Sequence, residues 1–144
     1  MHECVQYTDY SLKLFFNKIK HKKWFKNTLF VITADHTNIS FEKKYRSSSG
    51  IFRVPIIFYD PSNSNFNQKS NKIIQQIDIM PSILSYLNYN KPFISLGNNI
   101  FNDDNGFAIN YNNGFQLIMD DKVIVYNELE EKITKIFTLT NNLS

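Results

Sequence analysis

The segment Asn27-Thr28-Leu29-Phe30-Val31-Ile32-Thr33-Ala34-Asp35-His36 decides the fold class of this 144-residue chain. Its centre, residues 29–33, is a continuous run rich in β-branched and aromatic residues, which is typical of a strand buried on both faces of a sheet. A second run of the same kind is Val54-Pro55-Ile56-Ile57-Phe58-Tyr59. The two runs predict two buried strands, and the polar residues Asp35 and His36 come directly after the first.

Helical patterns flank these strands on both sides. Residues 7–20 place apolar side chains at spacings of three and four, which predicts an amphipathic helix with one buried stripe. A second helix is expected over 78–87, with Asp78 at its start and Pro81 in the first turn, where amide donors are unpaired anyway. Helix, strand, strand and helix predict an α/β domain with a mostly parallel sheet flanked by helices.

The C-terminal part of the chain has a different pattern. Short strand-like runs cover 107–111, 115–119 and 123–126, and Asn112-Asn113-Gly114 between the first two is a strong hairpin signal. Residues 133–139 predict one further strand, although 128–135 also fit a helix. We expect a single domain over 1–144, with an α/β part at 1–100 and an antiparallel β meander at 101–144.

Composition excludes several classes of protein. The chain is 42% hydrophobic and 15% aromatic, far above what a disordered chain carries, and its single cysteine, Cys4, excludes an internal disulfide or a Cys-based zinc site. The net charge is only +3, and the basic cluster at 18–26 fits a solvated helix end rather than a nucleic-acid surface. No apolar run approaches the roughly 20 residues of a membrane helix, and no signal-peptide pattern follows Met1, so we expect a soluble piece of protein.

Asp35 and His36 are the strongest candidates for a chemical role. Ligands of open α/β sheets gather beyond the carboxyl ends of the strands, where a carboxylate and an imidazole can both reach a cation. The alternative for such a dipeptide is a capped turn. Asp78 is interpreted as a helix N-cap rather than a ligand. Lys44, Arg46 and Arg53 are weak candidates for binding an anionic substrate, and a solvated loop is the alternative for them.

Several segments together resemble the sulfatase-type enzymes of the alkaline phosphatase superfamily, in particular the lipoteichoic acid synthase and phosphoglycerol transferase group. These segments are Tyr7-Thr8-Asp9, the stretch 24–36 that ends in Asp-His, the strand 54–59, and Gln76-Ile77-Asp78-Ile79-Met80-Pro81-Ser82-Ile83-Leu84. Their order and spacing follow the second half of such enzymes. The resemblance covers residues 5 to about 87 well and the closing meander more loosely.

The resemblance implies a role for each matching residue. Asp35 and His36 match two ligands of one divalent cation, manganese or a similar ion, that polarises a phosphoryl or sulfuryl oxygen. Members with two metals need another histidine downstream, and none follows His36. The family's nucleophile, a threonine in the lipoteichoic acid group, lies far N-terminal of the Asp-His pair, and Thr8, Thr28 and Thr33 do not match it. We therefore expect this chain to be the C-terminal part of a catalytic domain and inactive by itself.

The same resemblance favours phosphoryl-type transfer over sulfate ester hydrolysis. Arylsulfatases usually carry Asp-Asn where this chain has Asp35-His36, and Cys4 lies in no formylglycine motif. The implied substrates are phosphodiesters of a cell-envelope glycan or lipid, and relatives are commonly membrane-anchored through an N-terminal segment, with an exported catalytic domain. The alternatives are a sulfatase acting on sulfate-bearing substrates and a non-catalytic binding or scaffolding domain.

Overall fold

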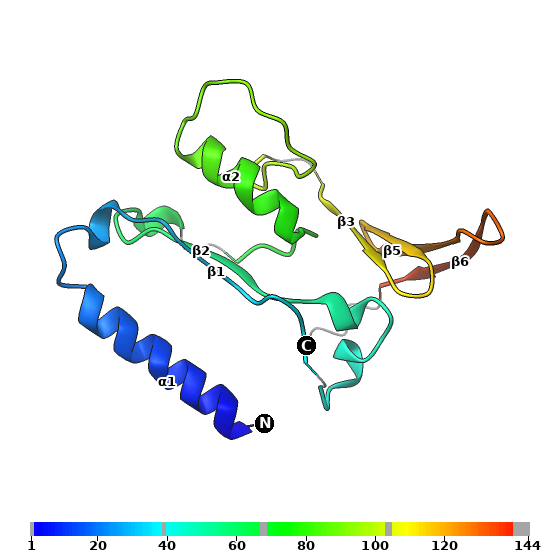
Figure 1. Ribbon diagram of the computed structural model, residues 1–144, viewed down its shortest axis with the longest axis horizontal. Helices are drawn as coiled ribbons and strands as arrows, with labels where there is room; N and C mark the ends of the chain where they lie inside the picture. Colours follow the sequence, from blue (N-terminus) through cyan, green and yellow to red (C-terminus); the bar gives the residue numbers. More distant parts are fainter. Residues whose placement is uncertain (1, 39, 67–68, 103–104, 140–144) are drawn as a thin grey trace. The chain divides into compact units, whose positions relative to one another are not determined.

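The computed structural model describes residues 2–38, 40–66, 69–102 and 105–139 (Figure 1). The chain divides into two compact units. Unit 1 comprises Met1–Thr33 and Ile56–Lys69, and unit 2 comprises Ala34–Pro55 and Ser70–Ser144. In the part of the chain that the structure describes, no helix is long and apolar enough to cross a membrane. The expectation of a single domain over 1–144 stays a prediction.

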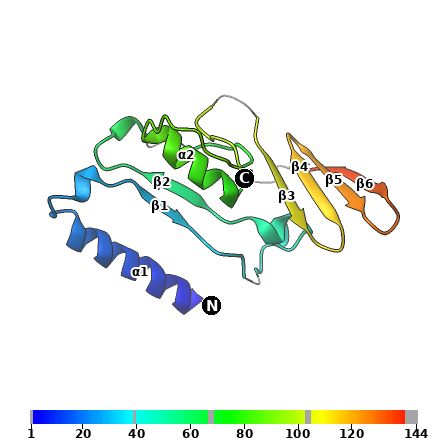
Figure 2. The ribbon, with the colours of Figure 1, turned by 45° about the horizontal axis from the view of Figure 1, so that its top comes forward.

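Unit 1 consists of one long helix beside a two-stranded sheet. Helix α1 spans His2–Ile19 and therefore begins upstream of the predicted start, with Glu3 in its first turn and Lys18 in its last, as the helix dipole favours. Strand β1, Phe30–Thr33, pairs with β2, Ile56–Tyr59. Helix α1 runs alongside this pair (Figure 2).

The core of unit 1 is a cluster of aromatic rings. The Phe30 ring of β1 lies 5.3 Å from the ring of Phe16 on α1, 5.6 Å from Phe25 and 5.9 Å from Tyr59 of β2. Phe30 also meets Trp24 at 6.5 Å. Aromatic rings at such separations attract each other, and this attraction adds to the stabilisation that comes from burying their apolar surface. The cluster therefore packs α1 against the sheet.

Two expectations for these strands were wrong. The strands pair antiparallel, from Phe30 opposite Tyr59 to Thr33 opposite Ile56. The connection between them contains two short 3-10 turns, η2 (Lys43–Tyr45) and η3 (Gly50–Phe52), and its described residues, 34–38 and 40–55, form no crossover helix of the kind that joins parallel neighbours. Nor is either strand buried on both faces, because the β1 residues are only partly buried or exposed and Ile57 of β2 is 48% exposed. The described sheets therefore form an α/β structure without parallel pairing.

In the second segment of unit 2, the 3-10 turn η5, Gln76–Asp78, continues directly into helix α2, Ile79–Tyr86. The helix buries Pro81 and Ser82. It ends where Asn88 adopts a positive φ of 54°, a conformation that Asn tolerates at helix ends, and the amide of Tyr89 donates to the Leu84 carbonyl. The second predicted helix is thus confirmed, with its first turn tightened to 3-10 geometry.

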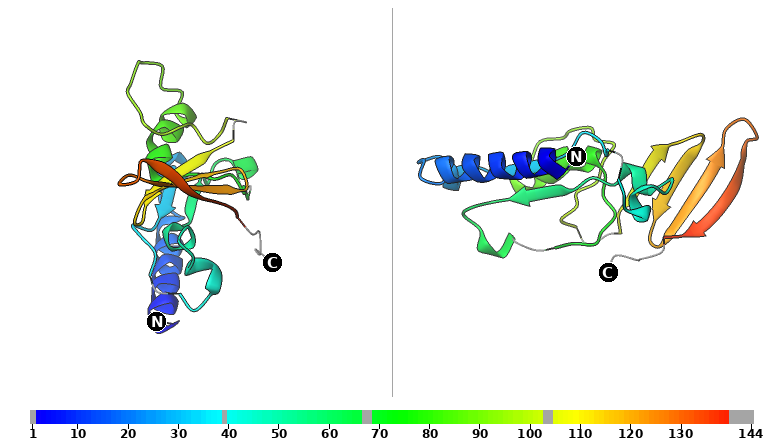
Figure 3. Two further views of the ribbon diagram at one scale, coloured as in Figure 1. Left: turned by 90° about the vertical axis from the view of Figure 1, so that its right-hand side faces the viewer. Right: turned by 90° about the horizontal axis from the view of Figure 1, so that it is seen from below.

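The predicted antiparallel meander is confirmed. Strands β3 (Phe107–Tyr111), β4 (Phe115–Met119), β5 (Lys122–Asn127) and β6 (Lys132–Thr138) pair in sequence order (Figure 3). The first turn uses Asn113 and Gly114, both at positive φ, as the hairpin signal requires. The segment that also fitted a helix leads into strand β6 instead. Residues 140–144 of the predicted meander region lie outside the described residues.

Candidate functional site

Asp35 and His36 stand just beyond the carboxyl end of β1, separated from Thr33 by Ala34. Their side chains are 85% and 79% exposed, and Asp35 Oδ2 lies 3.4 Å from His36 Nε2. Two atoms that each lie about 2.1 Å from one ion are about 3.4 Å apart when they subtend a roughly tetrahedral angle. The observed separation therefore suits two ligand atoms that share one cation.

Local hydrogen bonds orient the two side chains for this arrangement. The backbone N–H of His36 donates to Asp35 Oδ1 at 2.9 Å, which leaves Oδ2 on the side of the imidazole. His36 Nδ1 lies 2.7 Å from the carbonyl oxygen of Thr37. Because a carbonyl only accepts, Nδ1 of the neutral ring carries the proton and Nε2 keeps its lone pair. Nε2 is the nitrogen that faces Asp35 Oδ2, so a lone pair of the imidazole and a carboxylate oxygen lie side by side.

Sequence reasoning did not single out Gln76 as a functional residue. Gln76 begins η5, and its Nε2 donates to the carbonyl oxygens of Ala34 at 2.6 Å and Asp35 at 3.3 Å. Gln76 was part of the helix motif in the sequence, but a contact that spans 42 positions carries no periodic signal. The backbone of the Asp-His pair is therefore attached to the start of the η5–α2 segment.

The three basic candidates have different surroundings. Arg46 uses Nε and Nη2 to donate to the carbonyls of Ser40 and Phe41, each at 2.7 Å, so its guanidinium holds the loop. The Lys44 ammonium lies 5.2 Å from the centre of the Tyr45 ring. Arg53 is exposed and follows η3, whose Ile51 carbonyl accepts a hydrogen bond from the Thr37 hydroxyl. That bond ties the residue after His36 to the turn that carries Arg53.

The predicted N-cap of α2 is wrong in its bonding, because the Asp78 side chain makes no cap hydrogen bond to α2 and instead closes the η5 turn before it. Its carboxylate is 4% exposed and accepts from the amides of Gln75 and Asn98, each at 2.8 Å. The bond to Gln75 closes the η5 turn, and the bond to Asn98 fastens the loop after α2. Both carboxylate oxygens accept from backbone donors, and the residue is almost fully buried, which supports a structural role for Asp78.

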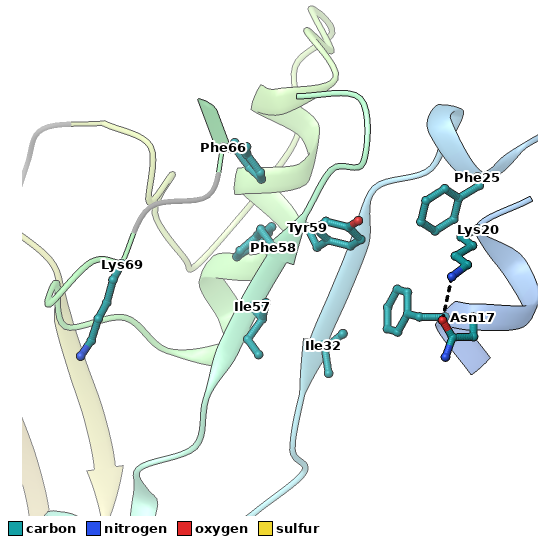
Figure 4. Close-up of a pocket in the computed structure, with 10 residues that line it drawn as sticks. Asn17, Lys20, Phe25, Ile32, Ile57, Phe58, Tyr59, Phe66 and Lys69 are labelled. Carbon is teal, nitrogen blue, oxygen red and sulfur yellow. Dashed lines mark hydrogen bonds between the residues drawn. The ribbon is translucent and has the colours of Figure 1, made fainter. Parts of the chain in front are cut away.

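Each of the two units contains a cavity. Unit 1 contains one of about 610 Å³ between α1 and the sheet, with aromatic and aliphatic walls (Figure 4). Lys20 stands among its lining residues, and its Nζ donates to Asn17 Oδ1 at 2.9 Å. Unit 2 contains one of about 220 Å³ beside Asp78 and Lys72. Neither lining includes Asp35 or His36, and the described residues contain no group of three or more His, Cys, Asp or Glu side chains suited to a metal.

Comparison with known proteins gives one match. A family model described as Sulfatase matches residues 2–89, which include α1, both strands of unit 1, the Asp-His pair and helix α2. Searches of the curated proteins and of the solved structures find no match.

Proposed function

Because this chain belongs to the sulfatase family, we propose that Asp35 and His36 hold one divalent cation in an enzyme of phosphoryl-type transfer or hydrolysis. The observation that carries the proposal is the 3.4 Å separation of Asp35 Oδ2 and His36 Nε2. The hydrogen bond from Nδ1 to Thr37 supports it, because a metal-binding histidine usually fixes its tautomer through the other ring nitrogen. The mixed oxygen and nitrogen set suits manganese or a similar divalent ion.

Other side chains of this loop would add positive charge to the proposed site. When bound, the cation acts as a Lewis acid toward a phosphoryl oxygen. Arg53 and Lys44 carry positive charge that would attract the anionic group of a phosphate- or sulfate-bearing substrate. Arg46 contributes by holding the loop closed through Ser40 and Phe41 rather than by meeting substrate. The chain thus offers two metal ligands and a cationic loop.

Three threonine hydroxyls of the described residues are already engaged with backbone carbonyls. The hydroxyls of Thr8, Thr28 and Thr37 each donate to a backbone carbonyl, those of Cys4, Trp24 and Ile51 in turn. We therefore propose that this chain forms the C-terminal part of a catalytic domain whose nucleophile comes from another segment. In such a domain the antiparallel pair β1–β2 would join a larger sheet whose other strands are mostly parallel.

The substrate and location of that parent enzyme follow from the resemblance in sequence. We propose phosphodiesters of a cell-envelope glycan or lipid, handled by an exported catalytic domain with an N-terminal membrane anchor. A second candidate, sulfate ester hydrolysis, is favoured by the description of the matching family. The Asp-His dipeptide, in place of Asp-Asn, supports phosphoryl-type chemistry instead.

Titration calorimetry with Mn²⁺ tests the metal role. Replacing an outer partner of a metal ligand typically weakens binding 10–100-fold, so removing a ligand itself, in Asp35→Asn or His36→Gln, should weaken it by at least about tenfold. The controls Asp9→Asn and His21→Gln make the same chemical changes at exposed positions on and just beyond α1 and should leave the affinity unchanged. Equal affinity in all five proteins would refute the proposal.

A further inference from the structure

We propose that Gln76 is a positioning residue, which fixes the peptide plane between Asp35 and His36 and so sets the relative placement of the two proposed metal ligands. This inference rests on the proposed function. Gln76 does not touch the ligand atoms themselves. It donates from Nε2 to the carbonyl oxygens of Ala34 and Asp35.

The peptide bond that links Asp35 to His36 is held at both of its polar ends. Its carbonyl is the Asp35 oxygen, 3.3 Å from Gln76 Nε2, and its N–H is that of His36, which donates to Asp35 Oδ1 at 2.9 Å. The preceding carbonyl, of Ala34, accepts the shorter bond of 2.6 Å from the same amide nitrogen. Rotation of either peptide plane would break one of these bonds and would change the separation of Oδ2 from Nε2.

Gln76 is itself anchored on a well-bonded turn. The neighbouring Gln75 amide donates to Asp78 Oδ2, the Asp78 amide donates to the Gln75 carbonyl, and Asp78 Oδ1 binds the Asn98 amide. The Gln75 side chain accepts at 3.1 Å from the amide of Ile109 in β3. Gln75 thus connects the η5 turn to the meander, and Gln76 connects the same turn to the Asp-His segment. Metal sites need such support, because their ligands must be held to within about 0.5 Å of the productive geometry.

The side-chain chemistry at position 76 is specific. Both bonds end on carbonyl oxygens, which only accept, so the residue must supply donors. Methionine has a similar length and shape but no donor, which makes Gln76→Met a test of the hydrogen bonds with little change in volume. Lysine restores a donor of similar reach. Gln6→Met makes the same change at an exposed position of α1 and is the matched control.

Two measurements on the full chain separate this inference from the metal proposal. The first needs no metal: hydrogen exchange of the amides at 34–38 should be several-fold faster in Gln76→Met, restored in Gln76→Lys, and unchanged in Gln6→Met. The second is the Mn²⁺ affinity, which should fall about tenfold in Gln76→Met. Replacing a residue that supports a metal ligand typically lowers metal affinity about 10–100-fold, and Gln76 supports only the backbone of the ligands. The far-UV circular dichroism of each variant should match the parent chain.

The outcomes are distinct. Unchanged exchange at 34–38 in Gln76→Met overturns the positioning role whatever the metal result. Faster exchange with unchanged Mn²⁺ affinity, while Asp35→Asn loses affinity, also overturns it and leaves the metal site standing. If Asp35→Asn binds Mn²⁺ as well as the parent chain, the proposed function fails, and the exchange data alone then decide whether Gln76 holds this segment.

Discussion

The aromatic core of unit 1 allows a quantitative test of the fold through a pair of substitutions, Phe30→Ala and Ile57→Ala. The two residues lie on paired strands, and the sequence pattern treats them alike. The structure does not. The Phe30 ring meets four other aromatic rings within 6.5 Å. The Ile57 side chain lines the cavity of unit 1 and is 48% exposed.

The expected magnitudes follow from these surroundings. Truncating a buried Phe to Ala lowers the free energy of unfolding by about 3–5 kcal/mol. Because Phe30 is only partly buried, we expect a loss of about 3 kcal/mol for Phe30→Ala. A buried Ile loses about 2–5 kcal/mol on truncation, so half exposure reduces the loss at Ile57 to about 1–2 kcal/mol. The first substitution should therefore be the more damaging by about 1–2 kcal/mol.

Urea denaturation followed by far-UV circular dichroism measures both free energies of unfolding. Phe41→Ala is the matched control, since its side chain is 72% exposed, and its effect should stay within about 0.5 kcal/mol. If Phe30→Ala leaves no folded protein, Phe30→Leu should still destabilise more than the control. A loss at Ile57 equal to or larger than the loss at Phe30 would refute the packing described for unit 1.

Three further predictions concern other parts of the chain. Asp78→Ala should lower the free energy of unfolding by about 2–4 kcal/mol, because the Gln75 and Asn98 amides lose a buried acceptor, and an unchanged urea midpoint would contradict this. The hydrogen bond from the Tyr111 hydroxyl to Glu128, together with the carboxylate charge, holds the pKa of Tyr111 above its ordinary value of 10.0. The associated stability is present below about pH 10 and is lost as pH rises through the raised pKa, so Glu128→Gln should move the Tyr111 ring titration, followed by NMR, to lower pH. Finally, the 144-residue chain should release no nitrophenol from a nitrophenyl phosphodiester or sulfate with Mn²⁺ present, and metal-dependent turnover would refute the missing nucleophile.

Local patterns in the sequence predicted most of the individual elements. The spacing of apolar residues located both helices, and Asn113-Gly114 located the first hairpin of the meander. Such features depend on residues close together in the chain. The directions of β1 and β2 depend on the 34–55 connection, whose 3-10 turns give no periodic signal, so the antiparallel pairing could not be predicted.

The candidate site shows the same division between local and distant contacts. The adjacency of Asp35 and His36 and their position after a strand could be read from the sequence. The role of Gln76 could not, because its bonds to Ala34 and Asp35 join residues 42 and 41 positions apart. Arg46 was grouped with Arg53 by its charge and its place in the loop after the pair, whereas its bonds to Ser40 and Phe41 show that its guanidinium holds the loop backbone.

The central claim is that one cation binds between Asp35 and His36, and paramagnetic broadening by Mn²⁺ tests it most directly. With the backbone amide resonances of the full chain assigned, substoichiometric Mn²⁺ should broaden the signals of residues 34–38 first. The broadening should disappear in Asp35→Asn. Broadening that instead begins at the exposed acidic residues Glu128, Glu130 and Glu131, with 34–38 unaffected, would contradict the account.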